Sequence, residues 1–306
     1  MKRLAALLLI SASAAGAQTR YEALCDASAA VALDERHFVV ADDEHNKLSV
    51  YQRGQAKRVG QVDLKFLKAD KESDLEGAAQ VGKRIYWIAS HARNSAGEPR
   101  PDRQRFFATE IVGTTVEPVG KPYTGLLADL LATPALAPLR LAEAAGRAAE
   151  AEGGLNIEGL AAAADGSLLI ALRNPIPQGR AIVIPLLNPA ELIDGKGPAR
   201  FGAAIRMDLG GRGLRSIERV STTYLIAAGP TADAGTFAIY RWSGKAADAP
   251  TPVKLDLGTL RPEALFAWPD GQITLLSDDG GVMVGKKACK DADKSKRSFR
   301  AFDFKP

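Results

Sequence analysis

Residues 73–93 read SDLEGAAQVGKRIYWIASHAR, and this stretch indicates how the chain folds. An acidic turn and a Glu-Gly pair open a short apolar segment, and a Gly-Lys turn leads into a second apolar segment that ends in Ser90 and His91. Two short apolar segments joined by a tight turn are typical of antiparallel strands. The stretch therefore predicts two neighbouring strands of one sheet, with Glu76 near the start of the first.

The same plan recurs at four other places along the chain. The related stretches are residues 26–51 (DASAAVALDERHFVVADDEHNKLSVY), 155–175 (LNIEGLAAAADGSLLIALRNP), 215–230 (RSIERVSTTYLIAAGP) and 261–281 (RPEALFAWPDGQITLLSDDGG). Repeated small antiparallel sheets are the signature of a β-propeller, whose blades bury apolar faces against one another. We therefore predict an all-β fold made of a single β-propeller. Residues 21–24 and 298–304 can pair from opposite ends of the chain to complete one more blade, so we expect six blades.

Residues 124–154 break this pattern because they are rich in Ala and Leu and carry apolar residues at helical spacing. Pro134 and Pro138 divide the segment into two helices, and Gly153 and Gly154 end the second helix. We expect a helical insertion between the second and third repeats. It packs either on one rim, as a lid, or on the side of the propeller.

The first 17 residues have the layout of an export signal. Lys2 and Arg3 precede an apolar run, and small residues follow up to Ala17. We expect cleavage after Ala17, a propeller domain over residues 18–306, and a periplasmic or secreted protein; an N-terminal strand or membrane anchor is the alternative. No other segment approaches the roughly 18 consecutive apolar residues of a membrane helix, so no membrane span is expected.

The composition is that of an ordinary globular protein, with 46% hydrophobic and 25% charged residues. The formal net charge of +4 falls to +2 once Lys2 and Arg3 are removed (4 − 2 = 2). That charge is too small to indicate a nucleic-acid partner. We expect a monomer.

Cys25 and Cys289 are the two cysteines of the chain. An oxidising compartment permits a disulfide between them, which would close a loop of 264 residues (289 − 25 = 264). Such a bond would hold the two chain ends together, as a closed circular fold requires. Two free thiols are the alternative.

Glutamates recur at one position when the repeats are aligned on their apolar segments. They are Glu76, Glu158, Glu218 and Glu263, while Ser28 takes this position in the first repeat. If the first strand of each pair is innermost, these carboxylates converge on the central channel, where they repel one another unless a cation, arginines or protonation compensates. The alternative is that each Glu accepts backbone N–H bonds in its own turn.

Carboxylates from several strands match the preference of Ca²⁺, which takes about 6 to 8 oxygen ligands. We predict a calcium site. Its predicted ligands are Glu76, Glu158 and Glu263, joined by Asn174, Asp43 or Asp279.

Arginines follow the strands of the second and third repeats. Arg93, Arg105 and Arg173 are predicted to bind a small anionic ligand, because guanidinium forks match phosphate and carboxylate oxygens. The alternative is that they belong to solvated loops. His91 is a candidate general base, with Glu76 or Glu158 as other candidates for the catalytic proton transfer.

Several other kinds of site are not expected. The three histidines show no zinc-binding spacing, and there is no Gly-x-Ser-x-Gly elbow or Walker loop. These observations argue against a zinc site, an α/β serine hydrolase and an NTPase.

At residues 73–93, together with NIEGLAAAADGSLLIALRNP (156–175) and PEALFAWPDGQITLLSDDGG (262–281), the chain resembles a bacterial family called domain of unknown function 3616. That family is similar in turn to the phytase-like esterase and SdiA-regulated β-propellers. The resemblance covers roughly residues 26–285 and implies a secreted or periplasmic propeller whose Glu-Gly carboxylates share one site. It supplies no established substrate. The chain departs from the theme at Glu218, which no glycine follows, so an asymmetric site is expected.

Three functions are open at this point. The first is a calcium-dependent hydrolase of a phosphoester, another ester or a lactone. The second is a non-catalytic periplasmic module that binds an anionic ligand or a partner protein on the same rim. The third is a scaffold that holds a structural Ca²⁺.

Overall fold

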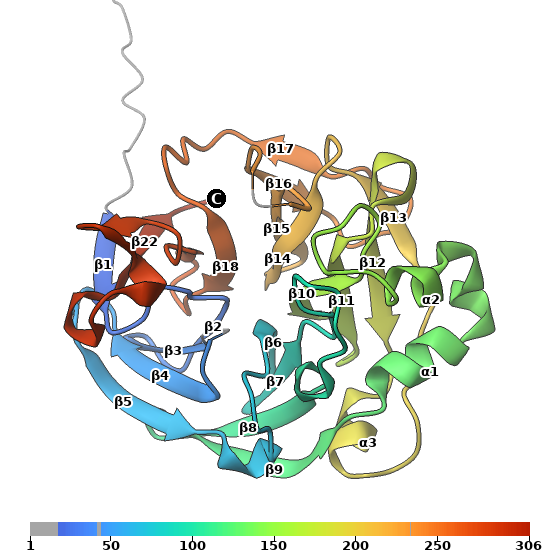
Figure 1. Ribbon diagram of the computed structural model, residues 1–306, viewed down its shortest axis with the longest axis horizontal. Helices are drawn as coiled ribbons and strands as arrows, with labels where there is room; N and C mark the ends of the chain where they lie inside the picture. Colours follow the sequence, from blue (N-terminus) through green and yellow to red (C-terminus); the bar gives the residue numbers. More distant parts are fainter. Residues whose placement is uncertain (1–17, 42–43, 233) are drawn as a thin grey trace, which may run out of the picture.

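A computed structural model describes residues 18–41, 44–232 and 234–306. The expected export signal (residues 1–17) and the predicted ligand Asp43 lie outside these described residues. Within them, five four-stranded antiparallel sheets surround a central axis as the blades of a propeller (Figure 1). The prediction of a single β-propeller is therefore confirmed.

Each blade is a sheet whose first strand lies next to the axis. Blade one comprises β2 (Ala29–Ala32), β3 (His37–Ala41), β4 (Lys47–Gln52) and β5 (Arg58–Asp63). Blade two comprises β6 (Leu75–Val81), β7 (Arg84–Ala89), β8 (Phe106–Val112) and β9 (Thr115–Tyr123). Blade three comprises β10 (Asn156–Ala162), β11 (Leu168–Asn174), β12 (Arg180–Leu186) and β13 (Ile205–Asp208). Blade four comprises β14 (Gly213–Val220), β15 (Thr223–Gly229), β16 (Ala238–Trp242) and β17 (Thr251–Val253).

Blade five closes the ring with strands from both ends of the described chain. It comprises β18 (Pro262–Ala267), β19 (Ile273–Ser277), β22 (Ser298–Phe304) and β1 (Gln18–Glu22). Strand β1 pairs with β22, with Tyr21 opposite Phe299, so the two segments do pair as expected. They complete the sheet of β18 and β19, however, and form no sheet of their own. The described residues therefore make five blades, not the six expected from the sequence.

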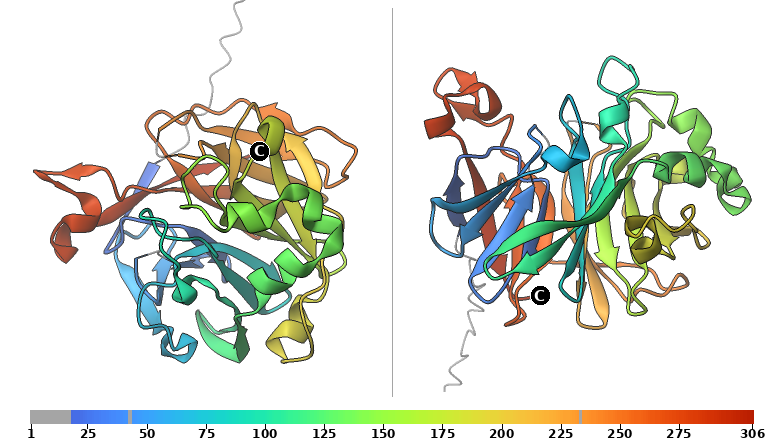
Figure 2. Two further views of the ribbon diagram at one scale, coloured as in Figure 1. Left: turned by 45° about the vertical axis from the view of Figure 1, so that its right-hand side comes forward. Right: turned by 90° about the horizontal axis from the view of Figure 1, so that it is seen from below.

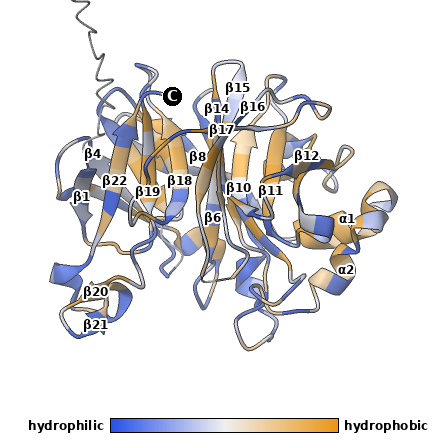
Figure 3. Cartoon of the chain, turned by 90° about the horizontal axis from the view of Figure 1, so that it is seen from above, coloured by the Kyte–Doolittle hydropathy of each residue, from blue (hydrophilic) through white to orange (hydrophobic). Residues whose placement is uncertain are grey.

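The apolar core is divided among the five interfaces between neighbouring blades. The innermost strands contact one another in the closed order β2, β6, β10, β14, β18 and back to β2. Trp87 and Phe107, for example, are buried between blades one and two. Figure 3 shows the hydrophobic residues concentrated along these strands and the polar residues at the loops. Burial of each large apolar side chain contributes about 1.5 to 3 kcal/mol, so each interface stabilises the ring.

Glycines in the inner strands allow this close approach of the blades. A Cβ at Gly77 would lie 2.8 Å from Ile88 Cγ2 and 2.9 Å from the backbone nitrogen of Leu160, in the next blade. A Cβ at Gly159 would lie 2.8 Å from the Cβ of Ala171 in the same blade and 3.2 Å from Ile217 Cγ2 in the next blade. The glycine of the Glu-Gly pairs is thus required by packing, which leaves the glutamate as the residue of the pair that is available for chemistry.

The insertion between blades two and three is helical, as expected. Its second helix ends at Ala144, however, and not at Gly153 and Gly154 as expected. It contains α1 (Leu126–Ala132), a 3₁₀ helix (Pro134–Leu139) and α2 (Leu141–Ala144). Leu126 and Leu130 are buried against blades two and three, so the helices lie on the outer side of the propeller (Figure 2). The end of the insertion turns inward, where Ala148 bridges to Arg93. The packing of the helices corresponds to the expected placement on the side of the propeller.

The remaining elements are short. They are α3 (Pro189–Ile193), the hairpin β20 (Met283–Val284) and β21 (Lys287–Ala288), and 3₁₀ helices at Lys65–Leu67, Pro101–Arg103, Pro177–Gly179, Cys289–Asp291 and Lys294–Lys296. None of the helices within the described residues is long and apolar enough to cross a membrane.

Cys25 and Cys289 form a disulfide, with their Cα atoms 5.8 Å apart. The bond joins the segment after β1 to the segment after the β20–β21 hairpin, which projects from blade five (Figure 2). The predicted pairing is confirmed. A disulfide is typical of proteins that reside outside the cytoplasm.

Candidate functional site

Four inner strands carry a β-bulge at the same place near their first residues. The pairing register shifts at Glu76 in β6, at Glu158 in β10, at Arg215 in β14 and at Glu263 in β18. A bulge adds one residue that has no partner on the neighbouring strand, and it redirects that residue's side chain. All four bulged side chains line one cavity at this end of the propeller.

Glu76, Glu158 and Glu263 meet at this cavity. One carboxylate oxygen from each lies within 4.8 Å of the other two, and the three residues are 7%, 1% and 6% exposed. The cavity has a volume of about 890 Å³, and nine acidic and six basic side chains line it. If all of them were ionised, the wall would carry three excess negative charges. The site therefore favours a cation.

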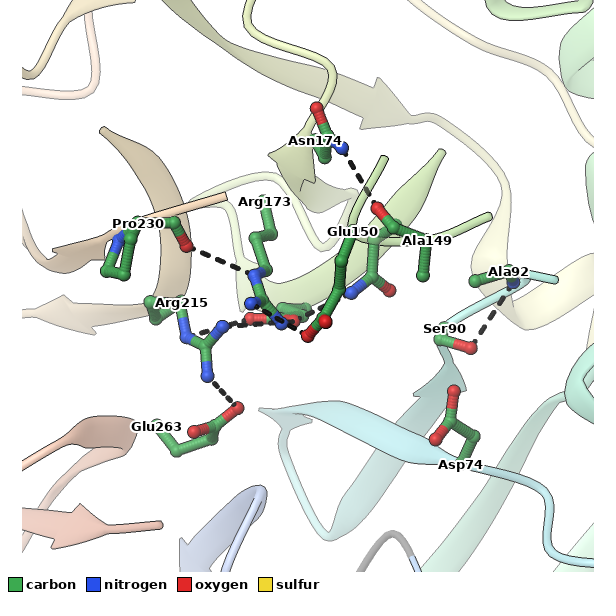
Figure 4. Close-up of polar contacts among 12 residues, drawn as sticks. Asp74, Ser90, Ala92, Ala149, Glu150, Arg173, Asn174, Arg215, Pro230 and Glu263 are labelled. Atoms are coloured by element: carbon green, nitrogen blue, oxygen red, sulfur yellow. Dashed lines mark hydrogen bonds and ion pairs between the residues drawn. The ribbon is translucent and has the colours of Figure 1, made fainter. Parts of the chain in front are cut away.

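Two arginines lie among the carboxylates (Figure 4). Arg215 places Nε 3.1 Å from Glu158 Oε2 and donates from Nη2 to Glu263 Oε1 at 2.5 Å. Arg173 donates to Glu158 Oε1 at 2.9 Å, and its other terminal nitrogen donates to Glu150 at 3.1 Å. Because both arginines are buried, these pairs act in a low dielectric, where charge interactions are strong.

The pKa values of the buried groups reflect this environment. Burial raises the pKa of Glu263 to about 8, although the neighbouring Arg215 acts in the opposite direction. Burial alone would lower the pKa of Arg215, but Glu158 and Glu263 raise it above its ordinary value. Burial thus favours the protonated form of Glu263, and a cation that binds its carboxylate competes with this proton.

A second pair of carboxyl groups lies on the same cavity wall. Burial and the neighbouring carboxylate of Asp278 together raise the pKa of Asp26 to about 8, and the two side chains share a hydrogen bond. Asp26 immediately follows Cys25 of the disulfide. Blade one therefore contributes Asp26 to the cavity, although the sequence alignment placed Ser28 at the shared position.

Of the predicted anion-binding residues, Arg93 and Arg173 line the cavity and Arg105 does not. Arg93 donates to the backbone oxygens of Ala145 and Gly97, which hold its side chain in place. Arg105 donates to the backbone oxygen of Pro101 and to Asp102, so it stabilises its own loop.

His91 is buried and is not among the residues that line the cavity. Its Nδ1 donates to Ala89 O at 2.8 Å, and Nε2 has no hydrogen-bond partner among the described residues. Burial lowers the pKa of His91 to about 4, so the ring is neutral. The structure thus separates His91 from the predicted catalytic residues Glu76 and Glu158, which it brings together.

Two predicted metal ligands lie apart from the three glutamates. Asn174 Nδ2 donates to the backbone oxygens of Ala149 and Ala151 and so anchors the end of the insertion (Figure 4). Asp279 is paired with Arg300 and is not on the cavity wall. Asp278, which precedes Asp279 in the chain, lines the cavity in its place. Asn156, the partner of Asn174 across the strand pair, lines it in place of Asn174. Successive side chains of an extended chain point in opposite directions, so a prediction that is wrong by one residue, as for Asp279, selects a side chain on the wrong face.

Glu218 was aligned with the other glutamates, but the pairing register shows that Arg215 occupies the equivalent bulge. Glu218 lies three residues further along β14, opposite Leu225, and burial raises its pKa to about 8. Sequence comparison matched the Ile-Glu dipeptides and could not detect the bulge. The missing glycine after Glu218 is not a sufficient clue, because Glu263 is followed by Ala264 and still occupies a bulge.

The three glutamates can hold a metal ion. Their oxygens are close enough to share one ion, and they are the hard donors that Ca²⁺ and Mg²⁺ prefer. Glu263 Oε2 and Asn156 Oδ1 are buried and accept no hydrogen bond from the described residues. A buried acceptor without a donor is costly, and a cation bound beside such an atom would satisfy it. The donor set fits a hard divalent cation.

Comparison with known proteins gives three results. Residues 147–262, from the end of the insertion to the first residue of β18, match the family model described as "Protein of unknown function (DUF3616)". The matched range contains Glu158, Arg173 and Arg215. No curated protein matches the chain.

Solved structures with a similar arrangement are distant in sequence. Hydrazine synthase of Kuenenia stuttgartiensis is 11% identical over 89% of this chain and 62% of that chain, with a TM-score of 0.40. A glucose dehydrogenase-type putative oxidoreductase of Thermus thermophilus is 13% identical over 94% and 100%, with a TM-score of 0.47. The PQQ-bound aldose sugar dehydrogenase of Streptomyces coelicolor is 13% identical over 94% and 99%, with a TM-score of 0.45. The family model alone identifies a relationship: residues 147–262, which contain blades three and four, are similar to DUF3616, a family of unknown function.

Proposed function

We propose that this protein is a calcium-dependent hydrolase that acts on an anionic ester, with a phosphoester as the first candidate and other esters or lactones as further candidates. The observation that carries the proposal is the meeting of Glu76, Glu158 and Glu263, from three blades, within 4.8 Å at an open cavity. Three converging carboxylates are costly without a counter-charge, and a site of this kind is typical of a cation-binding function.

In this proposal Glu76, Glu158 and Glu263 hold the cation. When bound, the cation supplies polarisation of the ester and a lower pKa for water. Arg93 and Arg173 lie on the same wall and hold the anionic group, since guanidinium groups bind phosphate and carboxylate oxygens. Glu76 and Glu158 remain candidates for accepting a proton from water, because they line the cavity, whereas His91 does not.

A second function is favoured by one observation. Arg215 already pairs with Glu158 and Glu263, so the cavity has an internal counter-charge in the absence of a metal. A non-catalytic module that binds an anionic ligand or a partner protein would need no more than this. The two proposals differ in whether a cation is required and in whether any substrate is turned over.

The proposal also includes the cellular location and the oligomeric state. We place the protein in the periplasm or outside the cell as a monomer, on the basis of the N-terminal sequence and the disulfide. A relation to the phytase-like esterase and SdiA-regulated propellers is part of the same proposal, and it rests on the Glu-Gly segments alone.

The test is turnover of a panel of phosphomonoesters, other esters and lactones by the purified protein, with Ca²⁺ or with a chelator. We expect one class to be hydrolysed only with Ca²⁺, and Glu158→Gln to lose at least a hundredfold in kcat/KM. Asp279→Asn is the matched control, because Asp279 is also a buried carboxylate paired with arginine but lies off the cavity. Inactivity of the wild type across the panel would favour the binding module.

A further inference from the structure

Arg215 occupies the position in blade four that glutamates occupy in blades two, three and five. In each of these blades the bulged residue of the inner strand lines the cavity. The ring of carboxylates is thus interrupted by one fixed positive charge, since an arginine stays protonated at any ordinary pH.

The guanidinium of Arg215 uses all three nitrogens on two of the three carboxylates. Nη2 donates to Glu263 Oε1 at 2.5 Å, Nε lies 3.1 Å from Glu158 Oε2, and Nη1 donates to Glu158 Oε1 at 3.4 Å. The side chain of Arg215 is 7% exposed, and Figure 4 shows it directed at Glu263. Arg215 therefore holds oxygens that a shared cation would also need.

Part of the cation site nevertheless remains available. Arg215 holds Oε1 of Glu263, whereas Oε2 of the same carboxylate is buried and accepts no hydrogen bond from the described residues. Asn156 Oδ1 is also buried and accepts no hydrogen bond from the described residues, while Asn156 Nδ2 donates to Glu158 Oε1. A cation can thus approach from a side that Arg215 does not cover.

We propose that a divalent cation and Arg215 compete for Glu158 and Glu263, and that the guanidinium released by the cation forms part of the binding site for a dianionic phosphoryl group. Binding of the cation and binding of the anion are then positively coupled. The inference rests on the proposed cation site and deepens it, because it names a phosphoryl dianion as the ligand class and Arg215 as the residue that links the two ligands.

The charges account for the coupling. With Glu263 protonated, the charges of Glu76, Glu158, Arg173 and Arg215 sum to zero. With Glu263 ionised, the five groups sum to −1, so neither state attracts an anion. A divalent cation changes the sum to +1, and the displaced fork of Arg215 offers two parallel N–H donors to phosphoryl oxygens. Because coupling between two ligands is reciprocal, the anion must also strengthen cation binding by the same factor.

The experiment is calorimetric titration of the full chain with Ca²⁺ and with methylphosphonate, a phosphoryl dianion that cannot be hydrolysed as an ester. For the wild type we expect methylphosphonate to bind at least tenfold more tightly when Ca²⁺ is present. For Arg215→Gln we expect Ca²⁺ to bind at least tenfold more tightly than to the wild type, and the gain in methylphosphonate affinity to fall below threefold. Arg300→Gln, which removes a carboxylate-paired arginine that lies off the cavity, is the control and should match the wild type in both titrations.

The outcomes separate this inference from the proposed function. If the wild type binds Ca²⁺ but Arg215→Gln binds it no more tightly, the inference is overturned and the calcium site stands. If only Arg215→Gln binds Ca²⁺, the competition is supported and the calcium-dependent function of the wild type fails. If neither binds Ca²⁺, both fail. Should Arg215→Gln not fold, the wild-type titrations decide, because equal methylphosphonate affinity with and without Ca²⁺ overturns the coupling.

Discussion

Blade five carries two buried carboxylates, Asp279 and Glu263, and each is paired with an arginine in a different way. Asp279 is held by Arg300 through both carboxylate oxygens, at 2.7 and 2.9 Å, and it also accepts from Ser277 and from the backbone nitrogen of Arg300. Its hydrogen-bonding capacity is used within the protein. Such a pair fixes the position of β22 relative to the end of β19.

Glu263 shares Arg215 with Glu158 and lies at a cavity, and its second oxygen accepts no hydrogen bond from the described residues. The chemistry of the two pairs is alike, and the difference lies in what each leaves unsatisfied. A carboxylate whose oxygens are all bonded serves the fold, whereas a buried oxygen without a donor at an open cavity indicates a place for a ligand. The predictions below separate these two roles.

The largest expected effect concerns the region around Asp279. Its backbone nitrogen donates to Cys25 O, beside the disulfide that closes a loop of 264 residues. Replacing Cys25 and Cys289 together by serine should lower the free energy of unfolding by up to about 5 kcal/mol, because the unfolded chain regains the entropy of that loop. Denaturant unfolding measures this change. An unfolding free energy equal to that of the wild type would contradict a stabilising role for the bond.

The next effect is expected at Asp279 itself. Asp279→Ala leaves Arg300 without its buried partner and should cost about 3 to 5 kcal/mol of stability. The rise in melting temperature caused by Ca²⁺ should remain, since Asp279 lies off the cavity. Thermal melting with and without Ca²⁺ checks both points. Loss of the Ca²⁺ response with unchanged stability would reverse the roles assigned to the two carboxylates.

Glu263→Gln should show the opposite behaviour. Because burial raises the pKa of Glu263 to about 8, it favours the neutral carboxyl group near pH 7, and glutamine keeps an acceptor for Arg215. We expect a change in stability below about 1 kcal/mol without Ca²⁺, in the range of a mutation that preserves shape and hydrogen bonding. The Ca²⁺-dependent rise in melting temperature should disappear. A full Ca²⁺ response in this variant would remove Glu263 from the cation site.

The stability should also depend on pH. The pKa of Asp26 is about 8 in the folded protein against an ordinary value of 3.8, so the folded state binds more protons between these values. Stability from this group is therefore complete below about pH 4 and is lost as the pH rises toward 8, with a slope of at most about 1.4 kcal/mol per pH unit. Unfolding of the wild type and of Asp26→Asn across this range measures it. The unfolding free energy of Asp26→Asn should depend less steeply on pH than that of the wild type. The same dependence in both proteins would show that Asp26 is ionised throughout this range.

Much of the fold was predictable because it depends on patterns that repeat. The alternating apolar segments and their turns identified the strands of the blades, and the joining of the chain ends by β1, β22 and the disulfide followed from closure of a ring. The number of blades was not predictable. The terminal segments can either form a separate sheet or complete an existing one, and only the pairing of β22 with β19 decides between these arrangements.

The candidate site was predictable where a local motif marks it. Glu76 and Glu158 are followed by the glycine that the blade contact requires, and Glu263 follows the same apolar pattern. Arg215 was not recognised as an equivalent residue, because a bulge shifts the register without leaving a mark in the sequence. Asp279 and Asn174 were wrongly predicted to lie at the cavity. The sequence at the end of a strand does not show which of two adjacent side chains points inward.

The most direct test of a cation site is anomalous X-ray diffraction from crystals of the protein grown with Ca²⁺. The account predicts one anomalous peak at the cavity, within about 2.3 to 2.6 Å of an oxygen from each of Glu76, Glu158 and Glu263. It also predicts that Arg215 moves away from Glu263 when that peak is present. No peak at saturating Ca²⁺, with Arg215 still paired to both Glu158 and Glu263, would contradict the account.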